Sequence, residues 1–127
     1  MSRVLVIDDD EMVLKALSIY LSGSGFTILT TADGPQGITI YKQEKPDVVI
    51  LDIGLPSLDG LEVLKQIRNV DPKAKIIICS GYGSATTIDE AMQNGAYAFL
   101  NKPFDVEAMI RLIVSALKSE TDSSRSI

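Results

Sequence analysis

The chain has 127 residues, a formal net charge of −5, one cysteine and no histidine. Its length fits one globular domain, and its acidic balance, without a basic stripe, argues against nucleic acid or an anionic membrane as a direct partner. The lack of histidine excludes zinc sites built from Cys and His, and catalytic dyads of the Ser-His or Cys-His type. A metal ion would need oxygen ligands, which favours Mg²⁺, Mn²⁺ or Ca²⁺.

The single cysteine, Cys79, follows three isoleucines. We expect it to be a buried apolar side chain in a reducing compartment. No secretory signal opens the sequence, and no apolar run approaches the ~18 residues of a membrane span. We therefore expect a soluble, cytoplasmic domain.

Five short apolar runs alternate with stretches of helical character. The runs are Val4–Ile7, Thr27–Thr31, Val48–Leu51, Lys75–Cys79 and Tyr97–Leu100. Three of them are continuously apolar, which is typical of parallel strands that are covered on both faces. The run Thr27–Thr31 is more mixed, and we expect it nearer an edge of the sheet.

The first two intervening stretches predict helices of unequal strength. The first ends at Gly23 and has one apolar face. The residues of that face are Val13, Leu17, Tyr20 and Leu21. The second stretch begins at Asp33, a plausible N-cap, with Pro35 in its first turn. Gly37 and three β-branched residues lower its helix propensity, so we expect a weak helix.

The last three stretches also have the apolar spacing of helices. The third starts near Asp59 and ends before Pro72, the fourth runs from Ser84 to a C-cap at Gly95, and the fifth follows Asp105. Their apolar positions are Leu61, Leu64 and Ile67, then Ile88, Ala91 and Met92, then Met109, Leu112, Ile113 and Ala116.

This alternation predicts an α/β fold with a doubly wound, five-stranded parallel sheet. Right-handed crossovers would place helices on both faces, giving a flavodoxin-like (βα)₅ domain in three αβα layers. We assign residues 1–118 to this domain. Residues 119–127 have no core-forming pattern, and we interpret them as a polar tail or a truncated linker.

Carboxylates follow two of the predicted strands, at the edge of a parallel sheet where ligands bind. The residues are Asp8, Asp9 and Asp10 after the first run, and Asp52 after the third. One of the first three could cap the next helix. Two carboxylates about 4 Å apart repel by roughly 4 kcal/mol in a protein surface environment. A divalent cation would relieve this repulsion, so the cluster predicts a site for Mg²⁺, with Mn²⁺ as a second option.

Three further interpretations concern the same edge. Asp52 could be a turn residue, but beside the first cluster it is better interpreted as a nucleophile, because aspartate carboxylates form acyl phosphates. Lys102 is either a solvated lysine or a cation that pairs with Asp52 or with a phosphoryl oxygen. Ser80 is either a turn residue or a hydroxyl donor to phosphoryl oxygen. Pro103 could follow a cis peptide bond, whose isomer the sequence does not show.

In this order and spacing, five segments resemble the receiver domain of two-component response regulators, over about residues 3 to 118. The segments are Val-Leu-Val-Ile-Asp-Asp-Asp, Val-Val-Ile-Leu-Asp-Ile-Gly-Leu-Pro, Asp-Gly, Cys-Ser-Gly and Phe-Leu-Asn-Lys-Pro-Phe. The resemblance implies that Asp52 accepts a phosphoryl group from the phosphohistidine of a sensor histidine kinase or a phosphotransfer protein. It implies a signalling domain that catalyses only its own phosphorylation and dephosphorylation.

The resemblance also implies roles for single residues. The Mg²⁺ ligands would be Asp8 (directly or through water), Asp9, Asp52 and the backbone carbonyl of Gly54. Ser80 would be the switch hydroxyl, Phe99 the switch aromatic residue, and Lys102 the contact to the phosphoryl group. Gly54 and Tyr82 would influence the phosphoryl lifetime. Asp10 would add acidity or cap a helix.

The implied output surface is the fourth helix, the fifth strand and the fifth helix. Through it the domain would control an output domain or a partner protein, and a phosphorylation-dependent homodimer is one option. Two positions depart from the commonest family pattern: Gly81 stands where Ala is most frequent, and Leu55 stands where Met is common. Neither departure removes a chemical group.

Two alternatives remain from the sequence. A phosphatase of the haloacid-dehalogenase class could use Asp8, Asp10, Ser80 and Lys102. However, Met12 stands where Thr or Val is expected, no paired-Asp motif follows the lysine, and Asp52 would have no role. A pseudo-receiver, a binding module that never carries phosphate, would leave the complete set of acidic and switch residues unexplained.

Overall fold

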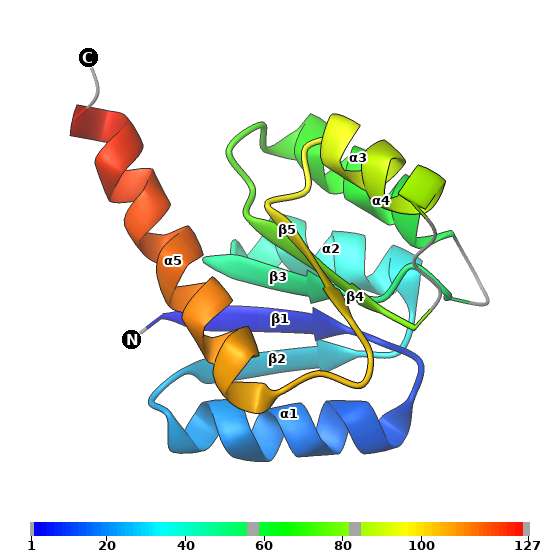
Figure 1. Cartoon of the computed structure of the whole chain (residues 1–127), viewed down its shortest axis with the longest axis vertical. Helices are drawn as coiled ribbons and strands as arrows, with labels where there is room; N and C mark the ends of the chain where they lie inside the picture. Colours follow the sequence, from blue (N-terminus) through cyan, green and yellow to red (C-terminus); the bar gives the residue numbers. More distant parts are fainter. Residues whose placement is uncertain (1, 56–58, 82–84, 126–127) are drawn as a thin grey trace.

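The computed structural model describes residues 2–55, 59–81 and 85–125, with side chains as far as Lys118. Its five strands lie in one parallel sheet of order β2-β1-β3-β4-β5. The strands are β1 (Arg3–Ile7), β2 (Thr27–Thr31), β3 (Val48–Leu51), β4 (Ile76–Ser80) and β5 (Ala98–Asn101). The arrowheads of β1, β2 and β3 point the same way in Figure 1. The predicted doubly wound α/β fold is confirmed, and the mixed strand Thr27–Thr31 lies at an edge.

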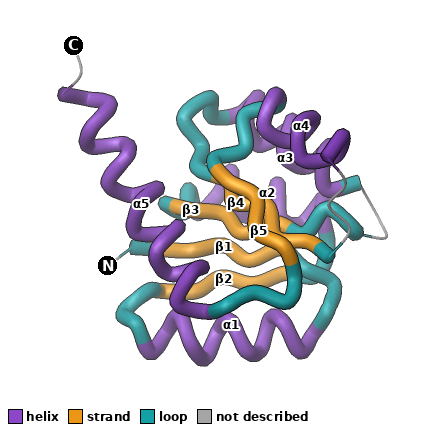
Figure 2. The backbone as a smooth tube through the Cα atoms, viewed as in Figure 1, coloured by secondary structure: helices purple, strands orange, loops and turns teal. Residues whose placement is uncertain are grey.

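Within the described ranges, five helices alternate with the strands. They are α1 (Glu11–Gly23), α2 (Gly34–Glu44), α3 (Gly60–Val70), α4 (Ala85–Gln93) and α5 (Val106–Arg125). Helices α1 and α5 cover one face of the sheet, and α2, α3 and α4 cover the other (Figure 2). The predicted start of the fourth helix at Ser84 lies outside the described residues.

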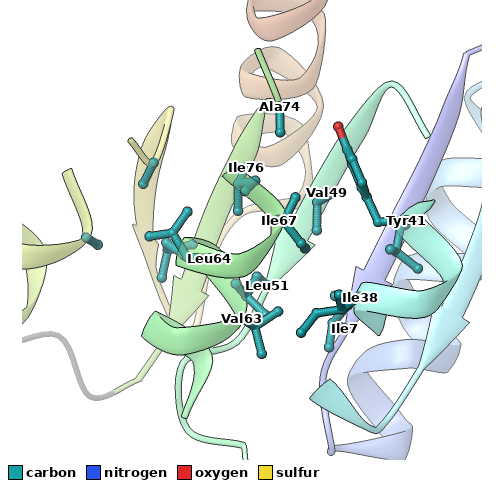
Figure 3. Packing of buried hydrophobic residues seen from close by; sticks show 14 of the residues in the cluster. Ile7, Ile38, Tyr41, Val49, Leu51, Val63, Leu64, Ile67, Ala74 and Ile76 are labelled. Atoms are coloured by element: carbon teal, nitrogen blue, oxygen red, sulfur yellow. The ribbon is translucent and has the colours of Figure 1, made fainter. Parts of the chain in front are cut away.

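The apolar runs are continuous because each strand contributes to a core on both faces. Alternate residues such as Ile7 and Leu51 point toward α2 and α3, as Figure 3 shows. The intervening residues, such as Val6 and Ile50, pack against α1 and α5 on the opposite face. Cys79 belongs to this second cluster and is 1% exposed, which confirms its predicted burial.

The predicted N-cap of α2 and the predicted C-cap of α4 are both present. Asp33 accepts a hydrogen bond from the Gln36 amide at the start of α2. This intrinsically weak helix forms because Ile38 and Tyr41 on it are buried in the core, and tertiary packing outweighs propensity. At the end of α4, Gly95 has a φ of +96°, a left-handed conformation that suits the predicted C-cap.

Some details differ from the sequence prediction. Tyr20 and Met92 were expected on apolar helix faces, but they are 55% and 44% exposed. On each helix, the side chains that contact the sheet form a narrower strip than the apolar residues in the sequence suggest. Strands β4 (Ile76–Ser80) and β5 (Ala98–Asn101) each begin and end one residue later than predicted, and β1 begins one residue earlier, at Arg3. Helix α5 continues to Arg125 and extends past the sheet (Figure 1). The interpretation of residues 119–127 as a tail or linker stays a prediction.

Among the described residues, none of the helices combines the length and the apolar character that crossing a membrane requires.

Candidate functional site

Two acidic residues meet at the carboxyl edge of the sheet because β1 and β3 are direct neighbours. Ile7 pairs with Leu51, and Asp8 and Asp52 are the residues that follow this pair. The Asp52 amide donates to the Ile7 carbonyl at 2.9 Å, so strand pairing continues up to the site. The strands therefore hold both carboxylates rigidly, with only 3% of Asp8 and 7% of Asp52 exposed.

Asp9 completes an acidic cluster at this edge. Carboxylate oxygens of Asp8, Asp9 and Asp52 lie within 4.8 Å of one another. Three hard oxygen donors at this separation fit Mg²⁺, which prefers carboxylates and water. The cluster borders an open depression of about 450 Å³. The residues that line the depression are Asp9, Asp10, Asp52, Gly54, Gly81 and Lys102.

Lys102 reaches into the cluster from the loop that follows β5. Its backbone amide donates to the Ser80 carbonyl at 3.1 Å, which anchors the loop to the end of β4. Its Nζ atom lies 2.7 Å from Oδ2 of Asp8 and 3.4 Å from Oδ2 of Asp52. The peptide bond to Pro103 is cis. Of the two interpretations of this lysine, the structure supports the cation at the acidic edge.

Each buried carboxylate uses its two oxygens differently. Oδ2 faces Lys102, whereas Oδ1 accepts a hydrogen bond from the amide two residues further along. The Asp10 amide donates to Asp8 at 2.9 Å, and the Gly54 amide donates to Asp52 at 3.0 Å. Neither amide contact was predicted from the sequence, although Asp52-Ile53-Gly54 has the Asp-x-Gly pattern of such a turn. They fix the orientation of both carboxylates.

At this edge one ammonium group contacts two buried carboxylates, and a third carboxylate lies close by. Burial raises the pKa of Asp8 above its ordinary value, although hydrogen bonds from Lys102 and from the Asp10 amide act in the opposite direction. Burial alone would lower the pKa of Lys102, but the hydrogen bonds and charges of Asp8 and Asp52 outweigh it and raise this pKa. The rise at Lys102 follows from the two carboxylates that one ammonium group serves, whereas the rise at Asp8 follows from its burial. A divalent cation would reduce the excess of negative charge at this edge.

The remaining predicted residues lie around this edge. Ser80 ends β4 and is fully buried. Phe99, in the middle of β5, is half-buried and packs against the cluster on the α2–α4 face. Asp10 accepts from the Met12 amide and is the N-cap of α1, so its capping role is confirmed. Tyr82 lies outside the described residues.

Cys79 precedes Ser80 and is a free, buried thiol. Burial raises the pKa of its thiol to about 12. The thiol is therefore protonated at neutral pH, and a buried neutral thiol is a poor nucleophile and a poor metal ligand.

An apolar groove of about 540 Å³ adjoins the acidic depression and shares Lys102 with it. One wall is the exposed side of α1, where Met12 is 81% exposed, and the other is the loop that leads into α5. The lining residues are Met12, Val13, Ala16, Leu17, Tyr20, Lys102, Pro103, Phe104 and Val106. This groove was not predicted from the sequence, because Val13, Leu17 and Tyr20 were assigned to the apolar face of the first helix that packs on the core.

The sequence matches the model of the response regulator receiver domain over residues 4–114. It is 34% identical to the chemotaxis protein CheY of Bacillus subtilis, over 91% of this chain and 97% of that protein. It is 32% identical to the transcriptional regulatory protein GlrR of Escherichia coli K12, over 97% of this chain. The chain spans only 28% of the length of GlrR.

Solved structures agree with these matches. A CheY-like receiver domain from Methanospirillum hungatei superposes with a TM-score of 0.94 at 25% identity, covering 97% of this chain and 98% of that one. CheY of Borrelia burgdorferi, solved in a CheX–CheY–BeF₃–Mg²⁺ complex, superposes with a TM-score of 0.86 at 32% identity, covering 90% and 87% of the two chains. With the acidic edge described above, these matches show that the chain belongs to the receiver domains of response regulators, which are signalling domains of two-component systems.

Proposed function

We propose that Asp52 is the phosphoacceptor of this receiver domain and takes its phosphoryl group from a phosphohistidine of a sensor histidine kinase or a phosphotransfer protein. One observation carries the proposal. Oδ1 of Asp52 is oriented by the Gly54 amide at 3.0 Å, while Oδ2 lies 3.4 Å from the Lys102 ammonium group. The carboxylate is thus buried, oriented and next to a cation, at the wall of an open depression.

In the transfer step, a carboxylate oxygen of Asp52 attacks phosphorus, and the bond from phosphorus to the imidazole nitrogen of the donor breaks. The nitrogen leaves with the bonding electron pair, and an acyl phosphate forms on Asp52. Lys102 would turn from the carboxylates to a phosphoryl oxygen. Catalysis of this kind consists mainly of positioning and of charge stabilisation.

Asp8, Asp9, Asp52 and the backbone carbonyl of Gly54 would hold Mg²⁺, for which Mn²⁺ could substitute. When bound, the metal ion supplies positive charge that offsets the charge on the phosphoryl oxygens. The same residues would serve hydrolysis, in which water attacks phosphorus and Asp52 leaves as the carboxylate. Autophosphorylation and autodephosphorylation would thus be the only reactions of the domain, with Gly54 and Tyr82 tuning the lifetime.

Phosphorylation would be transmitted through Ser80 and Phe99. A phosphoryl group adds nearly two negative charges and three acceptor oxygens beside the end of β4. The Ser80 hydroxyl would turn toward it, and the half-buried Phe99 would move inward. Because Phe99 packs against the cluster that includes Ala91 of α4, its movement would shift the population of the α4–β5–α5 surface. This surface would contact an output domain or a partner protein, or a second copy of the domain.

The apolar groove along α1 supports a protein donor rather than a small molecule alone. Exposed apolar patches commonly mark protein contacts, and this one ends at Lys102, beside the acceptor. The alternatives have less support. A pseudo-receiver leaves the clustered carboxylates without a role, and a haloacid-dehalogenase phosphatase leaves Asp52 without one.

Intact mass spectrometry after incubation with acetyl phosphate and Mg²⁺ tests the proposal. Wild type is expected to gain a hydroxylamine-labile phosphoryl adduct that EDTA prevents, and Asp52→Asn is expected to gain none. Asp33→Asn is the matched control, since Asp33 caps α2 by accepting from the Gln36 amide and does not line the acidic depression, and it should keep the adduct. An adduct on Asp52→Asn equal to that of wild type, or none on wild type, would contradict the proposal.

A further inference from the structure

Gly60, the first residue of α3, lies directly against the main chain of Asp52 and Ile53. A Cβ atom on Gly60 would lie 2.2 Å from the Cα atom of Ile53 and 2.6 Å from the carbonyl oxygen of Asp52. The Gly60 amide also donates to the Ile53 carbonyl at 3.2 Å. Main-chain atoms cannot rotate away as the end of a side chain can. The close approach therefore requires a residue without a side chain.

Backbone conformation does not explain this glycine. The described glycines with positive φ are Gly25 and Gly95, whereas Gly60 is the first helical residue of α3. Inside a helix, alanine is favoured over glycine by about 1 kcal/mol. At position 60, the steric overlap of a Cβ atom with the main chain of Asp52 and Ile53 would outweigh this gain in helix propensity. Glycine is therefore required here because a larger residue does not fit.

The contact between Gly60 and Ile53 is one residue away from the amide that orients the Asp52 carboxylate. The residue after Ile53 is Gly54, whose amide donates to Oδ1 of Asp52 at 3.0 Å. A shift of the Ile53 Cα atom would move the Ile53–Gly54 peptide, and with it the amide that orients the carboxylate. It would also move the Gly54 carbonyl, the backbone ligand in the proposed metal site.

Helix α3 cannot easily retreat from this contact. Val63, Leu64 and Ile67 on its inner face are fully buried and pack against β1, β3 and β4 (Figure 3). Asp59 caps the helix by accepting from the Leu61 amide at 3.0 Å, which fixes its first turn. The start of α3 is therefore a rigid support for the end of β3.

We infer that Gly60 is a positioning residue: the close approach of α3 to the Asp52–Ile53 main chain sets the geometry of the Asp52 carboxylate and of the Gly54 peptide for metal binding and phosphoryl transfer. The inference rests on the proposed function for the transfer step. The geometry of the Gly54 peptide and the affinity for Mg²⁺ can be measured without a phosphodonor.

Gly60→Ala tests the inference, with Gly95→Ala as the matched control. A Cβ on Gly95 would also be crowded, 2.4 Å from Nε of Arg68, and its φ of +96° would be strained. It follows α4, at the opposite edge of the sheet, so the control loses stability without touching the acidic cluster. For each protein, urea unfolding in EDTA gives the stability, and NMR gives the Gly54 amide proton shift and the Mg²⁺ dissociation constant. Acetyl phosphate gives the phosphorylation rate.

Gly60→Ala is expected to shift the Gly54 amide resonance and to weaken Mg²⁺ binding by about 10- to 100-fold, the usual effect of losing a residue that orients metal ligands. Gly95→Ala should lose stability but keep the wild-type Gly54 resonance and Mg²⁺ affinity. A Gly60→Ala protein with wild-type values for both would overturn the inference. Equal weakening in the two variants would also overturn it, because the effect would then follow stability alone.

Two additions keep the test decisive. If Gly60→Ala does not fold in buffer, all proteins are compared in trimethylamine N-oxide, which favours the compact state. Val63→Ala loosens α3 from the sheet without adding an atom, and it should weaken Mg²⁺ binding in the same direction by a smaller factor. If Gly60→Ala never folds, unchanged affinity in Val63→Ala refutes the inference. A wild type that takes no phosphoryl group refutes the proposed function, while the Gly54 resonance still decides the role of Gly60.

Discussion

At the amino edge of the sheet, Arg3 pairs with Glu44 on the surface, whereas at the carboxyl edge Lys102 pairs with two buried carboxylates. The Arg3 side chain is 35% exposed and that of Glu44 is 46% exposed, so water screens their charges. The Arg3 amide also binds the Asp47 carboxylate at 2.8 Å. At the amino edge these contacts join the start of β1 to the residues that precede β3.

The same type of ion pair therefore makes a different contribution to stability at the two edges. An exposed pair contributes about 0–1 kcal/mol, while breaking a buried pair costs several kcal/mol because a charge is left without compensation. At the carboxyl edge one ammonium group serves Asp8 and Asp52, with Asp9 close by. This edge therefore carries more negative than positive charge, at a cost in stability that a divalent cation would reduce.

Substitution of the two cations should separate the edges most strongly. Lys102→Met leaves Asp8 and Asp52 buried without their ammonium partner, and we expect it to lower the free energy of unfolding in EDTA by about 3 kcal/mol. Arg3→Met should lower it by at most about 1 kcal/mol. Urea unfolding followed by circular dichroism measures both. Losses of equal size in the free energy of unfolding would show that the buried ion pairs of Lys102 contribute no more than the exposed pair of Arg3.

Magnesium should stabilise the carboxyl edge through its acidic cluster. At a hundred times the dissociation constant, the ion is expected to raise the free energy of unfolding of wild type by about 2.7 kcal/mol. Asp9→Asn removes one charge of the acidic cluster and a proposed ligand, so its stability in EDTA should equal or slightly exceed that of wild type, while the gain with Mg²⁺ is mostly lost. Asp47→Asn, at the amino edge, should keep the full gain. If both variants lost the stabilisation by Mg²⁺ to a similar extent, the assignment of the metal site to the acidic cluster would be contradicted.

A smaller effect is expected from Cys79, beside the carboxyl edge. Its folded-state pKa is about 12 and its ordinary value is 9.0, so the folded protein holds a proton that the unfolded chain releases. This contribution to stability is complete below pH 9 and is lost as the pH rises toward 12. Between pH 7 and about pH 10.5, wild type should lose about 2 kcal/mol relative to Cys79→Ala. Parallel curves for the two proteins, measured by urea unfolding with reductant, would contradict a buried neutral thiol.

The sequence predicted the parts of the site that follow from strand order. Asp8 and Asp52 meet because each directly follows an apolar run, and parallel strands bring such residues to one edge. The Lys102 contacts follow from the same rule. Strand ends at Ser80 and Asn101 were predicted one residue short, because a polar residue at the end of an apolar run looks like the start of a loop.

Other features depend on contacts between distant segments and are not visible in a pattern. The approach of Gly60 to the Asp52–Ile53 main chain depends on how α3 packs, although a glycine just after an N-cap is a usable signal. The groove beside Lys102 was missed because an exposed Tyr20 has the same helical spacing as a core residue. The cis peptide before Pro103 was an open choice in the sequence.

Helix α5 has 20 residues, which corresponds to a length of about 30 Å. It begins shortly after Lys102 and Pro103, and it extends past the sheet on its way to Arg125 (Figure 1). A stiff rod of this length would act as a lever if its first turn tilted. A tilt of a few degrees at the turn beside the acidic edge would displace the far end by about 2 Å. A rearrangement too small to change the fold would then become a movement large enough to alter a contact with another protein surface.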